Sequence, residues 1–422
     1  MKSPGRKPRV ALLTNLVSPY RRPVFARMAR QLSLTLLHGK MESNRPWPEA
    51  PLPGACDRVV AGWTFRWTRR LAGRVCDRRY LHIEPGYIPE LLRARPEAII
   101  TIEIGFRTAV ALIYGALFRI PVWVWWGGTL HTEQNLSRLR RTIRFLAARC
   151  VRHWISYGAT STEYLLSLGV PRRRILQIQN CVDEAMFPGN TRPALDLHPK
   201  PVLLHAGRLV AGKGVAGFLE TAARLQKQGA SFSILLVGGG PDEALLRRRA
   251  AQLQLRNLHF VPSQPPEAMA SFYRSADVLV FPTLDDVWGL VANEAILSGL
   301  PVLCSKYAGC AQELFGEECI FDPADPDAFA DALRRAIAGT LPLVPRSRLL
   351  TAGQVGDMIA AAVLSELGLL PQETAAAAAR PFAFDRQPEM PVTEPVITGK
   401  LAARPAAQPH LVPVSDENPD FA

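Results

Sequence analysis

The sequence predicts an α/β fold made of two domains, each with a parallel sheet. Short Val, Ile and Leu runs alternate with helical patterns from residue 10 onward, and such continuous apolar runs are typical of parallel strands buried on both faces. Residues 184–200 interrupt the alternation with three prolines and no apolar run, which indicates a linker. A second alternating series begins at residue 202.

In the first series, the apolar runs predict strands and the patterns between them predict helices. The expected strands are Val10–Asn15, Leu32–Leu37, Ala98–Ile102, Val122–Trp126 and His153–Ser156. The expected helices are Pro23–Gln31, Ile88–Ala94, Thr108–Phe118 and Thr162–Leu168. Thr108–Phe118 is the longest apolar stretch, and it is too short to span a bilayer as a helix.

The second series repeats the pattern. The expected strands are Val202–His205, Ser233–Val237, His259–Val261, Val278–Phe281 and Val302–Ser305. The expected helices are Val215–Gln228, Asp242–Gln254, Pro266–Arg274 and Val291–Ser298, with a further helix near Val355–Leu367. Two Rossmann-like domains facing each other across a cleft are the expected architecture, with ligands at the carboxyl ends of the strands.

The composition divides the chain into five parts. We expect an N-terminal domain over residues 1–184, a linker over 185–200, a C-terminal domain over 201–340, a C-terminal helix within 341–370 and a tail over 371–422. The tail is rich in Ala and Pro and has no periodicity, so we expect it to be disordered.

Basic residues are concentrated in the N-terminal part. Residues 1–150 carry 26 Lys and Arg against 9 Asp and Glu, whereas the rest carries 24 against 28. We expect this part to meet an anionic membrane surface, a phosphorylated acceptor or nucleic acid; a plain solubilising surface is the alternative. No zinc-finger, RNP or helix-turn-helix signature supports nucleic acid, and we expect none as a partner.

Two segments are candidates for the anionic contact. Phe65–Tyr80 interleaves arginines with aromatic residues. Leu136, Leu139, Ile143 and Leu146 have helical spacing and lie among arginines. This second pattern fits a basic helix lying on a membrane surface. The alternative is a helix whose apolar stripe faces the core and whose outer face is charged.

Two glycine-containing loops follow strands of the second series. Gly207 and Gly212 let the backbone turn and approach a ligand, and Arg208 and Lys213 add two cations suited to a diphosphate. A basic loop without a ligand is the alternative. The run VGGGP at residues 237–241 allows a similar close approach at Gly239, and a tight turn explains it equally well.

A third segment carries two acids. Asp286 follows the strand ending at Phe281, and Gly289 and Leu290 start a helix whose free amides can bind phosphate. Glu294 lies one turn into that helix among apolar neighbours. Its carboxylate is costly to bury without hydrogen-bond donors, and sugar hydroxyls are good donors.

The motifs GR…KG, VGGGP, SADVLVFPT and two acids eight positions apart before SGLPV resemble the C-terminal domain of family-4 retaining glycosyltransferases, which have the GT-B fold. The resemblance covers roughly residues 8–338 and is strongest from 201 to 315. It implies that Arg208 and Lys213 hold the diphosphate of a nucleotide-sugar donor, that Glu294 holds the ribose hydroxyls and that Asp286 contacts the donor sugar. It also implies that no metal or other cofactor is needed.

The chain departs from the family pattern at four places. Asp286 stands where glutamate is usual, Pro262 where glycine is frequent, and Cys181 where the usual Asn-Gly-Val-Asp has glycine. The first loop, Thr14–Pro23, lacks the common paired glycines. In the N-terminal domain, His131 follows the strand Val122–Trp126, where the family often has a histidine facing the cleft; a loop histidine without a catalytic role is the alternative.

These observations predict a retaining glycosyltransferase that moves a sugar from a nucleoside-diphosphate sugar to a glycan or lipid-linked acceptor, in cell-surface polysaccharide or glycolipid synthesis. A phosphorylase or sugar-nucleotide epimerase on the same fold is the alternative, and a basic nucleic-acid-binding protein is a weaker one. Seven cysteines without a CxxC pair and an N-terminus without a long apolar region predict a cytoplasmic protein, with peripheral attachment to the inner face of the cell membrane left open.

Overall fold

The computed structural model describes residues 6–39, 51–71 and 74–371. The tail predicted over residues 371–422 therefore lies outside the described residues, except for Pro371.

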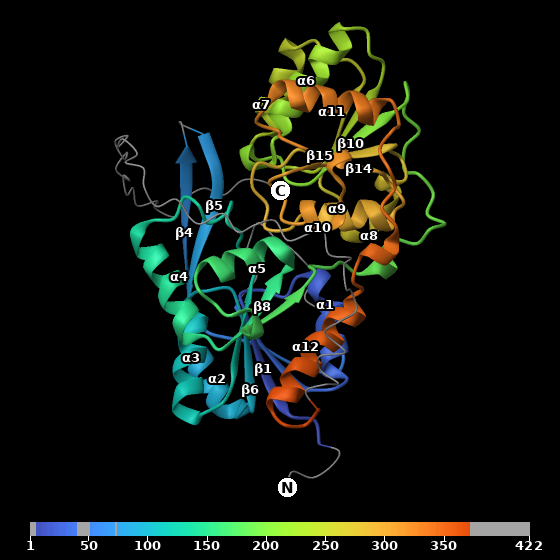
Figure 1. The fold of residues 1–422 in the computed structure, drawn as a ribbon. Helices are drawn as coiled ribbons and strands as arrows, with labels where there is room; N and C mark the ends of the chain where they lie inside the picture. Colours follow the sequence, from blue (N-terminus) through green and yellow to red (C-terminus); the bar gives the residue numbers. More distant parts are fainter. Residues whose placement is uncertain (1–5, 40–50, 72–73, 372–422) are drawn as a thin grey trace, which may run out of the picture. The chain divides into compact units, whose positions relative to one another are not determined.

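The described N-terminal residues form a parallel sheet of seven strands (Figure 1). In sheet order these are β3 (Cys56–Val59), β2 (Ser33–His38), β1 (Arg9–Thr14), β6 (Ala98–Ile102), β7 (Val122–Trp126), β8 (His153–Tyr157) and β9 (Ile175–Ile178). The chain moves from β1 toward β3 and then returns to continue from β6 toward β9. The order therefore reverses between β1 and β6, and in such sheets ligands bind outside the carboxyl ends of the strands at that point.

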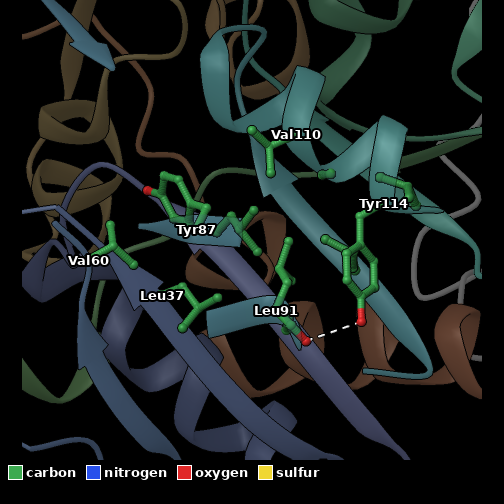
Figure 2. Packing of buried hydrophobic residues seen from close by; sticks show 11 residues of the cluster. Leu37, Val60, Tyr87, Leu91, Val110 and Tyr114 are labelled. Carbon is green, nitrogen blue, oxygen red and sulfur yellow. Dashed lines mark hydrogen bonds between the residues drawn. The ribbon is translucent and has the colours of Figure 1, made fainter. Parts of the chain in front are cut away.

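Helices connect the strands of this sheet. They are α1 (Arg22–Ala29), α2 (Tyr87–Ala94), α3 (Phe106–Phe118), α4 (Arg138–Cys150) and α5 (Gly158–Ser167), with short 3₁₀ turns at Pro19–Arg21, Arg172–Arg174 and Glu184–Met186. Figure 2 shows the buried cluster in which α2 packs on β1 and β2 and α3 packs on β6 and β7. In that cluster the Tyr114 hydroxyl donates to the Leu91 carbonyl at 3.2 Å, so the polar end of a buried ring is satisfied.

The second sheet has six described parallel strands and the same kind of reversal. In sheet order they are β12 (Leu258–Val261), β11 (Ser233–Val237), β10 (Val202–Ala206), β13 (Val278–Phe281), β14 (Val302–Ser305) and β15 (Ile320–Phe321). The helices are α6 (Val215–Lys227), α7 (Glu243–Gln252), α8 (Pro266–Tyr273), α9 (Leu290–Leu297), α10 (Ala311–Leu314) and α11 (Pro326–Ile337), with 3₁₀ turns at Ala211–Lys213, Glu317–Cys319 and Arg346–Arg348. Strand order reverses between β10 and β13, so the loops after these two strands meet.

The last described helix, α12 (Ala352–Glu366), packs against α1 rather than on the second sheet (Figure 1). Thr351 and Gln354 form a capping box that starts it. Arg27 makes a bidentate ion pair with Asp357, at 2.7 Å for each bond. The sequence predicted this helix near Val355–Leu367, but not the surface that it covers.

A two-stranded antiparallel hairpin, β4 (Trp63–Leu71) and β5 (Arg74–Ile83), was not predicted. It includes most of the segment Phe65–Tyr80 that was expected to contact an anionic partner. Trp63, Phe65 and Leu81 of the hairpin are exposed. Elsewhere the predicted strands agree closely: Ser233–Val237, with its continuous apolar run, has the expected bounds.

Candidate functional site

The loops after β10 and β13 are joined at the carboxyl edge of the second sheet. The Leu284 amide donates to the Gly212 carbonyl at 2.9 Å, and the Thr283 hydroxyl donates to the same carbonyl at 3.2 Å. Because β10 and β13 are hydrogen-bonded neighbours, these contacts hold the loop containing Lys213 against the loop containing Asp286.

Lys213 and Asp286 form an ion pair across these two loops, with 2.5 Å between Nζ and Oδ2. Both side chains are about one-fifth exposed, 21% and 18%, so the pair is reachable from solvent. The second carboxylate oxygen of Asp286 accepts the Trp288 amide at 3.2 Å. The expected diphosphate-binding cation and the expected sugar-binding acid are thus in direct contact, which the sequence did not predict. Arg208 lies on the same loop as Lys213 and is exposed.

Helix α9 begins directly beside this pair. Gly289, the residue before its first turn, has φ of +102°, and a Cβ there would meet the Phe281 ring at 2.4 Å. Only glycine fits this close approach. The first amides of a helix have no carbonyl partner within the helix, and its N-terminus carries partial positive charge. Gly289 and Leu290, the expected phosphate-binding backbone, therefore lie where an anion would be stabilised by both the helix and Lys213.

Backbone packing explains two of the glycines in the remaining loops, Gly238 and Gly240. A Cβ on Gly238 would meet the Gly207 carbonyl oxygen at 1.9 Å, and one on Gly240 would meet the Leu209 carbonyl oxygen at 2.3 Å. The Leu209 amide also donates to the Gly239 carbonyl at 2.9 Å. Glycine is required here because two loops pack against each other. Ligand contact by Gly207 and Gly239 remains a prediction.

Glu294 is buried within α9, with 4% of its surface exposed. Its Oε2 accepts the Tyr273 hydroxyl at 2.6 Å, and the Tyr20 hydroxyl is hydrogen-bonded to the same carboxyl group. Burial raises the pKa of Glu294 to about 7, although both hydrogen bonds act to lower it. The sequence predicted a carboxylate in need of hydroxyl donors; in the structure, two tyrosines provide them. No sequence signal pointed to Tyr273, whereas Tyr20 lies in the loop whose missing glycines were noted.

His131 lies against the loop that carries Asp286. Its Nε2 is 2.8 Å from the Leu284 carbonyl oxygen, and its Nδ1 is 3.3 Å from Gln134 Nε2. Its ring stacks on that of Tyr307, with 4.3 Å between the ring centroids. The structure thus brings His131 to the edge of the candidate site, with both ring nitrogens engaged by the protein. A catalytic role for His131 remains a prediction.

The apolar stripe of α4 faces solvent rather than the core. Leu139 is 71% exposed, and Ile143 and Leu146 are exposed as well. Ala147 and Ala148 make the buried contact instead. Arg144 also belongs to the inner side, because it pairs with Glu133 at 2.8 Å and lies over the Trp126 ring. The interpretation of the stripe as core-facing is therefore wrong.

Helix α3 presents a second row of exposed apolar side chains, Ile113, Leu117 and Phe118. The last turns of α3 and α4 lie close together, because residues of both line one pocket with Arg119, Arg152 and His153. Among the described residues, no helix has the length and apolar character needed to cross a membrane. The outer faces of α3 and α4 thus each expose apolar side chains, and exposed arginines accompany them at Arg119, Arg138, Arg141 and Arg149.

The segment Asp325-Pro-Asp327 stands at the start of α11 (Pro326–Ile337). Asp325 caps α11 by accepting the Asp327 and Ala328 amides at 3.0 and 3.1 Å. Within residues 6–39, 51–71 and 74–371, no group of three or more His, Cys, Asp or Glu side chains has the arrangement of a metal site.

Comparison with known proteins agrees with this geometry. Residues 190–347 match the model of the family described as glycosyl transferases group 1. A curated relative, the D-inositol 3-phosphate glycosyltransferase of Corynebacterium urealyticum, is 32% identical over 160 residues, which cover 35% of this chain and 38% of the relative. The match thus spans less than half of the relative's length.

Two solved structures resemble nearly the whole described chain. Sucrose-phosphate synthase from Thermosynechococcus elongatus has a TM-score of 0.57 at 18% identity and covers 88% of this chain and 100% of its own. The HepE protein of Anabaena, solved with UDP-glucose, has a TM-score of 0.58 at 17% identity. The match covers 87% of this chain and 99% of the HepE chain. These likenesses show the predicted GT-B fold.

Proposed function

We propose, from the match of residues 190–347 to the glycosyl transferases group 1 family, that the protein is a retaining glycosyltransferase that uses a nucleoside-diphosphate sugar. The observation that carries the proposal is the Lys213–Asp286 pair at the start of α9, at 2.5 Å. It brings a cation suited to a diphosphate and a carboxylate suited to sugar hydroxyls to the start of one helix.

In this mechanism the protein acts on charge and position. As the bond between sugar and diphosphate breaks, negative charge develops on the diphosphate. Arg208, Lys213 and the first amides of α9 stabilise that charge. Asp286 accepts hydrogen bonds from the donor sugar, and Glu294 accepts them from the ribose. The acceptor hydroxyl attacks from the face that the diphosphate leaves, and the diphosphate takes its proton; no metal takes part.

A nucleotide panel tests the donor site. UDP, GDP and ADP, each with its glucose conjugate, are compared by thermal shift, because a ligand selective for the native state raises its stability. We expect the protein to prefer one base. Glu294→Ala should weaken binding of that nucleoside diphosphate by about 1.5–3 kcal/mol, the range for a hydrogen bond to a charged group. Arg256→Ala, on an exposed loop before β12, is the control. No shift with any nucleotide would exclude the proposal.

The reaction type needs a separate measurement. Release of one nucleoside diphosphate for each sugar transferred, with the anomeric configuration of the donor kept in the product, identifies a retaining transferase. Epimerisation of the donor or phosphorolysis of a glycan would instead support the alternative enzymes.

We further propose that the acceptor is phosphorylated or lipid-linked and that the exposed surface of α3 and α4 lies on an anionic membrane. The net charge of residues 1–150 supports an anionic partner. The exposed apolar side chains of the two helices support insertion at the lipid headgroups. Each Lys or Arg near an anionic surface contributes about 1 kcal/mol. Sugar transfer to a lipid-linked glycan intermediate at the cytoplasmic face of the cell membrane is the role that fits the basic charge and the exposed apolar side chains.

A further inference from the structure

The carboxyl group of Glu294 joins two segments that are far apart in the sequence. Tyr20 lies in the 3₁₀ turn Pro19–Arg21, which follows β1 of the first sheet. Tyr273 is the last residue of α8. Both hydroxyls donate to Glu294, Tyr273 at 2.6 Å from Oε2. A ribose presents two neighbouring hydroxyls, so the two tyrosines satisfy the carboxylate in the way that a ribose would.

The two tyrosines differ in how firmly they are held. Tyr273 is fully buried and packs edge-on against Phe187, at 6.1 Å between ring centroids. Tyr20 is only partly buried and belongs to a three-residue turn. The Tyr20 hydroxyl is therefore the hydrogen-bond donor that can leave Glu294, whereas Tyr273 stays fixed in the core.

We propose that Tyr20 is a positioning residue of the donor site, whose hydroxyl holds the place on Glu294 that a ribose hydroxyl takes when the nucleotide binds. This rests on the proposed function, since it requires a nucleotide at Glu294. The exchange keeps a buried carboxylate satisfied in both states, because an unpaired one would be costly. It also means that the loop after β1 must shift when the donor enters.

The neighbouring residue shows what that shift would affect. Arg21 donates to the Tyr157 hydroxyl at 2.8 Å and lies over the Trp125 ring, at 5.8 Å from its centroid. Trp125 and Tyr157 stand at the carboxyl ends of β7 and β8. Release of Tyr20 would therefore disturb a cation that is held at the carboxyl edge of the first sheet.

Calorimetric titration of a hydroxyl-deleted variant tests the exchange. The probe is whichever of UDP, GDP and ADP the wild type binds most tightly, used alongside its 2′,3′-dideoxy form. Tyr20→Phe removes the competing hydroxyl and keeps the ring, so we expect it to bind the ribonucleotide on the order of tenfold more tightly, or about 1.4 kcal/mol. We expect no gain for the dideoxynucleotide, which has no hydroxyl to take the place of Tyr20.

Tyr114→Phe is the matched control, because it removes a buried tyrosine hydroxyl bonded to Leu91 in the core of the first sheet. It should leave both affinities unchanged. Weaker or unchanged binding of the ribonucleotide by Tyr20→Phe would overturn the inference. An equal gain for both nucleotides would also overturn it, since the ring would then only block space. If the wild type binds no nucleotide, the proposed function itself fails, independently of Tyr20.

Discussion

Lys213 and Asp286 are 73 residues apart in the chain, yet Nζ of one lies 2.5 Å from Oδ2 of the other. The pair forms because β10 and β13 are neighbours in the sheet, so their following loops share one edge. Without a ligand, each group partly neutralises the other. A diphosphate arriving at Lys213 therefore competes with Asp286, and a sugar hydroxyl arriving at Asp286 competes with Lys213.

The two members of this pair should respond differently to substitution. Lys213→Ala removes a cation from the diphosphate and should weaken nucleoside-diphosphate binding about tenfold or more. Asp286→Asn releases the ammonium, so affinity for the free nucleotide should stay at or above that of the wild type while turnover collapses. Calorimetry and product assays measure both, with Lys227→Ala on the exposed end of α6 as the control. A large loss of nucleotide affinity in Asp286→Asn would show that Asp286 binds the nucleotide rather than the sugar.

The buried carboxyl of Glu294 should make stability depend on pH. Its pKa is raised from 4.5 to about 7 by burial, so the native state holds this proton more tightly than the unfolded state. Stability from this group is therefore fully present below pH 4.5 and is lost as pH rises toward 7. The loss is on the order of 3 kcal/mol.

Urea unfolding of the wild type and of Glu294→Gln at pH 5 and pH 8 isolates this contribution. The free energy of unfolding of the wild type should fall relative to that of the variant between the two pH values. Other groups with shifted pKa values, such as Glu313 and His205, affect both proteins and cancel in the difference. Parallel pH profiles would mean that Glu294 ionises at its ordinary pKa.

Two glycines of the last described helix should respond oppositely to alanine. A Cβ on Gly356 would lie 2.7 Å from Cβ of Arg27 on α1 and 2.9 Å from the Val24 carbonyl oxygen. Gly356→Ala should cost about 1–3 kcal/mol by forcing α12 away from α1. Gly353 has its nearest neighbour at 3.7 Å, so Gly353→Ala should be neutral or stabilise by up to about 1 kcal/mol. Chemical unfolding measures the change in the free energy of unfolding for both variants. Equal changes for Gly356→Ala and Gly353→Ala would argue against tight packing of α12 on α1.

Membrane binding should depend on both charge and the exposed apolar rows. Flotation with anionic liposomes should fall steeply as salt rises, because salt screens the basic residues. Leu117→Glu with Leu139→Glu should abolish flotation at low salt. Leu343→Glu, which changes a leucine that is 62% exposed in the C-terminal part, should have no effect. Equal binding to neutral and anionic liposomes would count against an electrostatic contact.

The sequence by itself determined the two parallel sheets and where the expected site residues lie along the strands, loops and helices. Strands such as Val278–Phe281 and Val302–Ser305 have the predicted bounds, because a buried strand is a local run of apolar residues. The sequence also predicted the positions of Asp286, Gly289 and Glu294 around the start of α9, because the start of a helix is marked by local sequence.

The tertiary structure decided which residues touch across long separations. The contacts of Tyr20 with Glu294, of Lys213 with Asp286 and of Arg27 with Asp357 depend on strand order and on where the chain returns, and no period in the sequence encodes either. The stripe at Leu139, Ile143 and Leu146 is the clearest case. An amphipathic pattern states that two faces differ, but which face is buried depends on what packs beside it, and here the contact with the first sheet is made by Ala147 and Ala148.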